Sequence, residues 1–306
     1  MTPLLYVLAI FSQAAQSVTT KLNTKKNTDA VTFHLLKSIG FLAIVAVIYL
    51  FDIESNLGTL KYAAAFGVLL ALSHEFGYKA LTLGPMAKTS TIVTFSLLIP
   101  FTYGIVYLHE TPGVPQIIGV LLFFVALFLL RSPSPSEPGE GKKTSLKWGI
   151  FVAATMCCNG INAIIQKQHQ TAYKGHYTAE FTASAGFLVV VLFIVYYAIE
   201  KSREKKNHPA EPAGMPTTPD LPPEPKKKLS GAFLLGLISG GFNGSFNFLQ
   251  LTLAATENAS VLYPVLSAGV MLAVYLSGRI FFKEKMTLLQ NLGFVVGVCA
   301  IVLLKI

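Results

Sequence analysis

Ten long apolar segments account for most of this sequence. A helix needs about 20 mostly apolar residues to cross the hydrocarbon core of a bilayer. Segments near that length lie at residues 3–21, 30–51, 58–81, 86–108, 114–130, 147–166, 177–199, 230–253, 258–281 and 287–304. Only 13% of the residues are charged, against roughly 25% in soluble domains, so the chain could not cover its surface in water. The sequence therefore predicts an all-α polytopic membrane protein with ten transmembrane helices.

The second half of the sequence repeats features of the first. Residues 32–42 align without a gap on residues 178–188, and both stretches carry Gly-Phe-Leu at the same place. The same offset superimposes Lys21 on Lys167. Five segments per repeat is an odd number, so the two copies should cross the membrane in opposite directions, as an inverted repeat. We expect a binding site where the two copies meet.

Two segments between the apolar runs have the composition of flexible chain. Residues 132–145 are rich in Ser, Pro and Gly, which is typical of a linker, and residues 201–228 are rich in Pro, Lys and Glu, which is typical of disorder. The sequence therefore predicts a first five-helix repeat at residues 1–131 and a second at residues 146–306. The linker joins them, and the disordered loop belongs to the second repeat.

Basic residues are unevenly distributed among the loops. Lys and Arg are abundant after the odd-numbered segments and scarce after the even-numbered ones. The positive-inside rule then puts the odd-numbered loops in the cytoplasm and both termini outside. This bias accounts for the net charge of +9 without a nucleic-acid partner. The first segment follows no basic region, so we expect a retained helix in an integral protein of a bacterial plasma membrane.

The sequence has none of the motifs that carry catalysis or bind a cofactor. It lacks a nucleophile elbow, a phosphate-binding loop, a zinc-ligand spacing and a dinucleotide fingerprint. Cys157, Cys158 and Cys299 fall inside apolar segments and are interpreted as small packing residues. We therefore expect no enzyme, no cofactor and no metal site. The expected partners are a small-molecule substrate and the lipid bilayer, and the expected assembly is a monomer or a homodimer.

Carboxamide side chains recur at helical spacing on three of the apolar segments. They are Gln13 and Gln16 on the first, Asn159, Asn162 and Gln166 on the sixth, and Asn243, Asn247 and Gln250 on the eighth. Amides are costly in hydrocarbon unless paired, so these stripes should face the bundle interior. Each amide could simply pair with a neighbouring helix. Three stripes, two of them on repeat-related segments, favour a shared polar cavity.

Ionisable groups gather in the second and third segments. His34 and Lys37 lie on one face of the second, while His74, Glu75 and Lys79 lie late in the third. A charge at mid-membrane costs on the order of 3 kcal/mol on insertion scales, so it normally has a partner or a task. We expect Lys37 to pair with Glu75 across the two helices. Glu75 could instead pair with Lys79 at i, i+4, and Lys79 could extend to the headgroups. The same cluster could carry protons, although a structural ion pair would look alike in sequence.

Glycine and proline positions predict close helix contacts and bends. Glycines recur every fourth residue at Gly236, Gly240 and Gly244 in the eighth segment and at Gly293 and Gly297 in the tenth. Small residues at this spacing let helices approach closely, and packing within the chain is favoured over a dimer contact through the tenth segment. Pro100 and Pro264 lie inside the fourth and ninth segments and should kink them.

Several short motifs resemble those of one transporter family. Ala80-Leu-Thr-Leu-Gly-Pro85 precedes an apolar span that ends at Glu110, and Gln116-Ile-Ile-Gly119 follows. A second copy runs from Ala254 through Glu284 to Gln290-Asn-Leu-Gly293, with Ala259 where the first copy has Pro85. The chain thus resembles, over nearly its whole length, the EamA-type unit of the drug/metabolite transporter superfamily.

This resemblance implies a secondary transporter of small metabolites, with a central cavity between two inverted five-helix halves. In that family the cavity is lined mainly by the first, third, fourth, sixth, eighth and ninth spans. The corresponding positions here are Gln13, Gln16, His74, Tyr78, Thr94, Asn159, Asn162, Asn243, Asn247 and Tyr263. Many members are drawn with cytoplasmic termini, whereas the charge bias here indicates external ones.

Together these features predict an exporter of a small polar or amphipathic metabolite that works by alternating access. Amides would hydrogen-bond the substrate, two tyrosines would give it aromatic surface, and the charged cluster would set charge preference or couple protons. Within transport, an importer or an uncoupled facilitator is the alternative. A lipid scramblase or a structural membrane protein is the alternative of another class.

Overall fold

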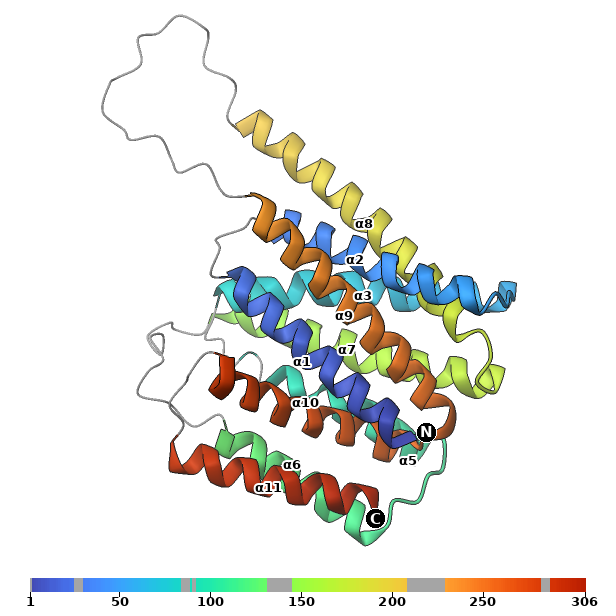
Figure 1. Ribbon diagram of the computed structural model, residues 1–306, viewed down its shortest axis with the longest axis vertical. Helices are drawn as coiled ribbons and strands as arrows, with labels where there is room; N and C mark the ends of the chain where they lie inside the picture. The colour runs from blue at the N-terminus through green and yellow to red at the C-terminus, as the bar shows by residue number, and fades with distance from the viewer. Residues whose placement is uncertain are drawn as a thin grey trace, which may run out of the picture.

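The computed structural model is a bundle of roughly antiparallel helices (Figure 1). It describes residues 2–24, 30–83, 89, 92–130, 145–207, 229–281 and 287–306. Every regular element within these ranges is helical: α1 (Thr2–Thr24), α2 (Ala30–Phe51), α3 (Leu57–Leu83), η1 (Phe95–Leu97), α5 (Leu98–Val106), α6 (Val114–Leu130), α7 (Leu146–Tyr173), α8 (Thr178–Asn207), α9 (Leu229–Thr256), α10 (Ala259–Phe281) and α11 (Leu288–Lys305).

The protein is a multi-pass integral membrane protein. Within the described residues, six helices, α2, α3, α7, α8, α10 and α11, are long and apolar enough to cross a bilayer, and shorter apolar helices lie at Ile92–Val106 and Val114–Leu130. Large apolar side chains face outward, among them Phe11 at 60% exposure and Phe187 at 63%. In water such a surface would be an aggregation hazard, whereas acyl chains solvate it.

The helix boundaries differ from the apolar segments at three places. The helix α7 continues to Tyr173, well past the expected end at residue 166. The helix α8 continues to Asn207, so the disorder expected from residue 201 is wrong for residues 201–207. The rest of that loop, residues 208–228, and linker residues 132–144 lie outside the described part of the chain, as do Gly84, Pro85 and Glu284 of the family motifs.

The third difference is an interruption of the fourth segment. The 3₁₀ turn η1 precedes α5, and Pro100 is the third residue of α5. Proline has no N–H to donate to the carbonyl of Ser96 and its ring crowds that carbonyl, so the α-helical ladder breaks there. In contrast, α10 continues through Pro264.

Helices from the two halves of the chain interleave. The helix α9 packs against α1 and α2, α3 packs against α7 and α8, α2 packs against α8, and α6 packs against α11. Further contacts join α1 to α10 and α5 to α7. The pair α6 and α11 forms one edge of the bundle in Figure 1, and both chain ends lie at the same end of the bundle. The two sequence halves therefore share one helical body.

Glycines make the α2–α9 contact unusually close. A Cβ atom at Gly240 would overlap the carbonyl oxygen of Lys37, and one at Gly40 would overlap that of Leu237. Gly236 and Gly244 lie in the same stripe and face α2 as well. Gly293 and Gly297 of α11 pack against α6 and α10. The prediction that these glycines serve packing within the chain is confirmed.

Candidate functional site

Six polar side chains from four helices form a continuous line of contacts, which we call the polar seam. Its members are Lys37 on α2, His74 on α3, Gln166 on α7, and Asn243, Asn247 and Gln250 on α9. The first two helices belong to one half of the sequence and the last two to the other. Residues 243 and 250 are about 10 Å apart along a helix axis, so the seam covers about a third of a hydrocarbon core.

One end of the seam is centred on His74. The Lys37 amino group lies 3.2 Å from His74 Nε2, and the amide nitrogen of Asn243 lies 3.4 Å from the same atom. Asn247 then donates its amide N–H groups to the side-chain and backbone oxygens of Asn243, at 2.6 and 2.8 Å. Asn243 and Asn247 are one helical turn apart, so this contact follows directly from their spacing.

The other end of the seam joins α9 to α7. The amide nitrogen of Gln250 donates to Gln166 Oε1 at 2.8 Å, and Gln166 Nε2 lies 3.5 Å from Asn247 Oδ1. Gln166 is almost completely buried, at 1% exposure. The amides of the sixth and eighth apolar segments therefore meet inside the bundle rather than in lipid.

The other two predicted amides of α7, Asn159 and Asn162, contact α3 and lie outside the seam. The Ser73 hydroxyl donates to Asn159 Oδ1. With its amide oriented to satisfy both groups, Asn162 donates to the Phe66 carbonyl and accepts from the Leu70 N–H, at 3.3 Å each. For Asn159 and Asn162, the simpler interpretation of amides as contacts between helices fits the structure.

The other expected lining residues have separate surroundings. The Tyr263 hydroxyl donates to the Ala163 carbonyl at 2.6 Å. Thr94 directly precedes η1. Gln13 and Gln16 on α1 each have a buried Oε1 atom with no hydrogen-bond partner among the described residues. These two carbonyl oxygens differ from the seam amides in being unsatisfied.

The expected ion pair between Lys37 and Glu75 is wrong. Glu75 pairs with Lys79 at 2.9 Å and accepts a hydrogen bond of 2.9 Å from the Tyr196 hydroxyl of α8. Successive residues of a helix point about 100° apart. Because His74 faces α2 and α9, its neighbour Glu75 faces α8 instead, and the i, i+4 alternative is the one observed.

Aromatic rings surround the His74 end of the seam. The His34 ring is nearly parallel to that of His74, with centroids 6.0 Å apart, and it also stacks on Phe193 at 5.5 Å. The Tyr78 ring meets His34 edge-on at 5.5 Å. Tyr78 is 37% exposed and contacts His34, which in turn stacks on His74 of the seam.

Sequence reasoning missed three charged groups that hold helix ends. Glu110 accepts from the backbone N–H groups of Ala259 and Ser260 at the start of α10, at 2.8 and 2.7 Å. Glu180 likewise accepts from the Asn56 N–H at the start of α3. Lys167 donates to the carbonyls of Ala254 and Glu257 at the end of α9, at 3.0 and 2.6 Å. The sequence feature that could have identified them is a charged residue within or beside an apolar segment, since such charges need partners.

The family-type motif near the start of α11 also has a structural explanation. The Thr287 hydroxyl accepts from the Gln290 N–H, and Gln290 Oε1 accepts from the Thr287 N–H. This reciprocal pair is a capping box, which satisfies N–H groups at a helix start. Gly293 then packs against Leu129 and Leu130 of α6.

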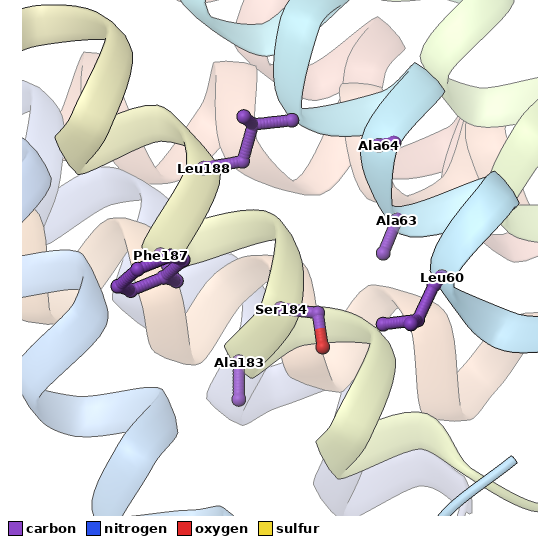
Figure 2. A pocket seen from close by; sticks show the side chains of 7 residues that line it. All are labelled: Leu60, Ala63, Ala64, Ala183, Ser184, Phe187 and Leu188. Atoms are coloured by element: carbon purple, nitrogen blue, oxygen red, sulfur yellow. The ribbon is translucent and has the colours of Figure 1, made fainter. Parts of the chain in front are cut away.

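A shallow groove lies away from the polar seam, between α3 and α8. It encloses about 430 Å³, and Figure 2 shows its lining of Leu60, Ala63, Ala64, Ala183, Ser184, Phe187 and Leu188. All of these side chains except Ser184 are apolar, and none belongs to the expected binding residues. Within the described part of the chain, no three His, Cys, Asp or Glu side chains come together to hold a metal ion.

Comparisons with known proteins indicate the fold but no family. No family model matches the chain. A protein of Haemophilus influenzae strain Rd, described as uncharacterized, is 23% identical over an alignment of 308 positions that covers 96% of this chain and 95% of that protein. One crystal structure of a protein matches with a TM-score of 0.70 and 13% identity, over 99% of this chain and 95% of its own. At that identity the likeness shows a shared fold alone.

Proposed function

We propose that this protein is an EamA-like secondary transporter that exports a small polar or amphipathic metabolite by alternating access. The observation that carries the proposal is the polar seam, which crosses from one half of the sequence to the other inside an apolar bundle. Polar groups at this depth cost free energy unless they are paired or have a task. Transporters built from inverted repeats bind their substrates where the repeats meet.

The proposal includes ten crossings in two inverted halves. Under this scheme α1, α2, α3, α5 and α6 correspond to α7, α8, α9, α10 and α11. If each helix is replaced by its counterpart in the other half, the contact α2–α9 becomes α8–α3, α1–α9 becomes α7–α3, and α1–α10 becomes α7–α5. All three contacts and all three of their counterparts are present in the structure. The contacts α2–α8 and α6–α11 are converted into themselves. A two-fold axis in the membrane produces such a pattern, and an even number of crossings agrees with both chain ends lying together in Figure 1.

The seam has features that favour ligand binding over purely structural pairing. Two of its contacts, at 3.4 and 3.5 Å, lie at or beyond the usual upper limit of hydrogen-bond length. A substrate can replace such contacts at little cost. The unsatisfied oxygens of Gln13 and Gln16 add acceptors on α1, which packs against α9. Unsatisfied buried acceptors are uncommon in structural contacts.

Efflux from proteoliposomes tests this function. The full chain is reconstituted with a defined pool of small polar metabolites, and the loss of each is followed by mass spectrometry with and without a pH gradient. At least one compound should leave faster than from protein-free liposomes. Gln166→Leu should slow it at least tenfold, because this change removes the α7 side of the seam, while Gln168→Leu on the exposed face of the same helix should not.

Each alternative has its own outcome in this assay. Acceleration by an opposing pH gradient indicates proton coupling, flux without any such effect indicates a facilitator, and preferred uptake indicates an importer. If every compound leaks at the protein-free rate, or if the two glutamine variants behave alike, the proposal fails. A scramblase would need polar side chains along a lipid-facing groove, whereas the groove in Figure 2 has Ser184 as its single polar lining residue. Scrambling of a fluorescent phospholipid in the same vesicles would nevertheless assign that function.

A further inference from the structure

Lys37 is a buried lysine with no acidic partner among the described residues. It lies about 10 Å from the start of α2 along the helix axis and is only 7% exposed. The contact of Gly240 with its backbone places it directly beneath α9. Within the described ranges no carboxylate oxygen is at ion-pair distance from its amino group, because the nearby Glu75 is engaged with Lys79 and Tyr196.

Hydrogen-bond directions show that the neighbours of Lys37 are neutral. The Asn243 side-chain oxygen accepts from Asn247, so its amide nitrogen is the atom that faces His74. An amide nitrogen and an ammonium group can only donate. With Lys37 as the ammonium, His74 Nε2 accepts from this closer donor, the ring proton lies on Nδ1, and the imidazole is uncharged. The positive charge of Lys37 meets only neutral groups.

The other helices around Lys37 do not supply the missing negative charge. The helix α9 has no charged residue at all. On α2 the nearest titratable neighbour is His34, which stacks on His74 and meets Tyr78 edge-on. From α8 the neighbouring side chain is Phe193, which stacks on both histidines. The site thus presents one cation, several amide donors and an aromatic wall.

Building on the transport function proposed above, we propose that the substrate carries an anionic oxygen group, a carboxylate or a phosphate, for which Lys37 is the counter-charge. A buried ammonium group is costly when alone and much less so beside an anion with hydrogen-bonding partners. Without substrate, the amide nitrogen of Asn243 makes a long contact with His74, and that of Asn247 donates to Asn243 one turn away. Both amides can turn to an anion held at Lys37. The rings of His34 and Phe193 enclose the apolar part of the substrate.

Ligand-dependent thermal unfolding of the purified full chain tests this inference. The probes are sodium phosphate, succinate and benzoate at the ionic strength of a sodium chloride reference, with glucose and putrescine as a neutral and a cationic probe. At least one anion should raise Tm by about 3 °C at ten times its Kd. A rise in Tm with phosphate alone would identify a phosphate site, and a rise with the carboxylates alone would identify a carboxylate site.

Variants then locate the effect at Lys37. Lys37→Met should weaken anion binding about 30-fold or more, since truncating one member of a desolvated charge pair has effects of that size. Lys37→Arg should retain binding, and Lys61→Met, an exposed lysine on α3, should match the wild type. Without ligand, Lys37→Met should melt no lower than the wild type, because it removes an uncompensated charge.

The inference is overturned if no anion raises Tm, if Lys37→Met responds like the wild type, or if unliganded Lys37→Met is strongly destabilised. A different result would separate the two proposals. If a neutral or cationic probe binds or is transported, if Gln166→Leu abolishes this, and if anions have no effect, the anionic substrate is refuted but the transport function stands. If no probe binds and no compound is transported, the proposed function fails as well.

Discussion

Replacing Gly240 with alanine should push α2 and α9 apart. A Cβ atom at Gly240 would overlap the Lys37 carbonyl oxygen and would lie 2.7 Å from the Phe41 nitrogen and 2.8 Å from the Lys37 carbonyl carbon. All three are backbone atoms, so no side-chain rotation can relieve the overlap. Gly241, the next residue, is a matched control, because the nearest atom to its Cβ position is the Gly40 oxygen at 4.0 Å.

The expected size of the effect follows from two opposing contributions. Alanine favours a helix interior over glycine by up to about 1 kcal/mol, and both variants gain this amount. Overpacking costs about 1–3 kcal/mol, and a clash with backbone belongs at the upper end. Gly240→Ala should therefore lower the free energy of unfolding by about 2 kcal/mol, while Gly241→Ala should raise it by up to about 1 kcal/mol.

Thermal unfolding in detergent, monitored by size-exclusion chromatography of heated samples, measures the difference in stability between the two variants. One kcal/mol corresponds to about 2 °C in a chain of this size, so the two variants should differ in Tm by about 6 °C. Gly240→Ala should also reduce binding at the polar seam, because Lys37 would move with α2. Equal Tm values for the two variants would refute the close contact between α2 and α9.

Three further changes test single contacts by the same thermal assay. Glu110→Gln should cost about 1 kcal/mol, because it replaces a charged acceptor at the N-terminus of α10 with a neutral one; an unchanged Tm would contradict that role. Lys167→Met should cost about 2 kcal/mol by leaving two carbonyls at the end of α9 without their donor, and hydrogen exchange should show fraying confined to that end. Tyr263→Phe should cost about 1 kcal/mol, because it removes a buried hydrogen bond to Ala163; a loss above 3 kcal/mol would point to a wider network.

The helices could be predicted because each apolar run must satisfy its backbone internally in lipid. Their ends were less accessible to sequence reasoning. The apolar run of α7 stops near Gln166, but the helix continues because Lys167 finds partners at the end of α9 and Gln170 finds one at the start of α8. A polar turn at a helix end looks like a loop in sequence, and only a partner from another helix shows that it remains helical.

In the candidate site, too, contacts within one helix could be predicted from the sequence, whereas contacts between helices could not. The Asn243–Asn247 contact follows from an i, i+4 spacing on one helix, so it was predictable as a shared stripe. The partner of Lys37 was predicted wrongly, because Glu75 and His74 are adjacent in sequence but point in different directions around α3. Periodicity identifies which residues share a face, but it does not say which helix that face meets.

By itself the sequence determined that this chain forms membrane-spanning helices and that its amides must turn inward, since hydrocarbon offers no hydrogen bonds to either backbone or side chains. The tertiary structure alone decided which polar groups meet. The rotation of each helix about its axis directed Glu75 to α8 and His74 to Lys37. A difference of one residue, about 100° around a helix, therefore leaves Lys37 without a carboxylate at ion-pair distance in the described part of the chain.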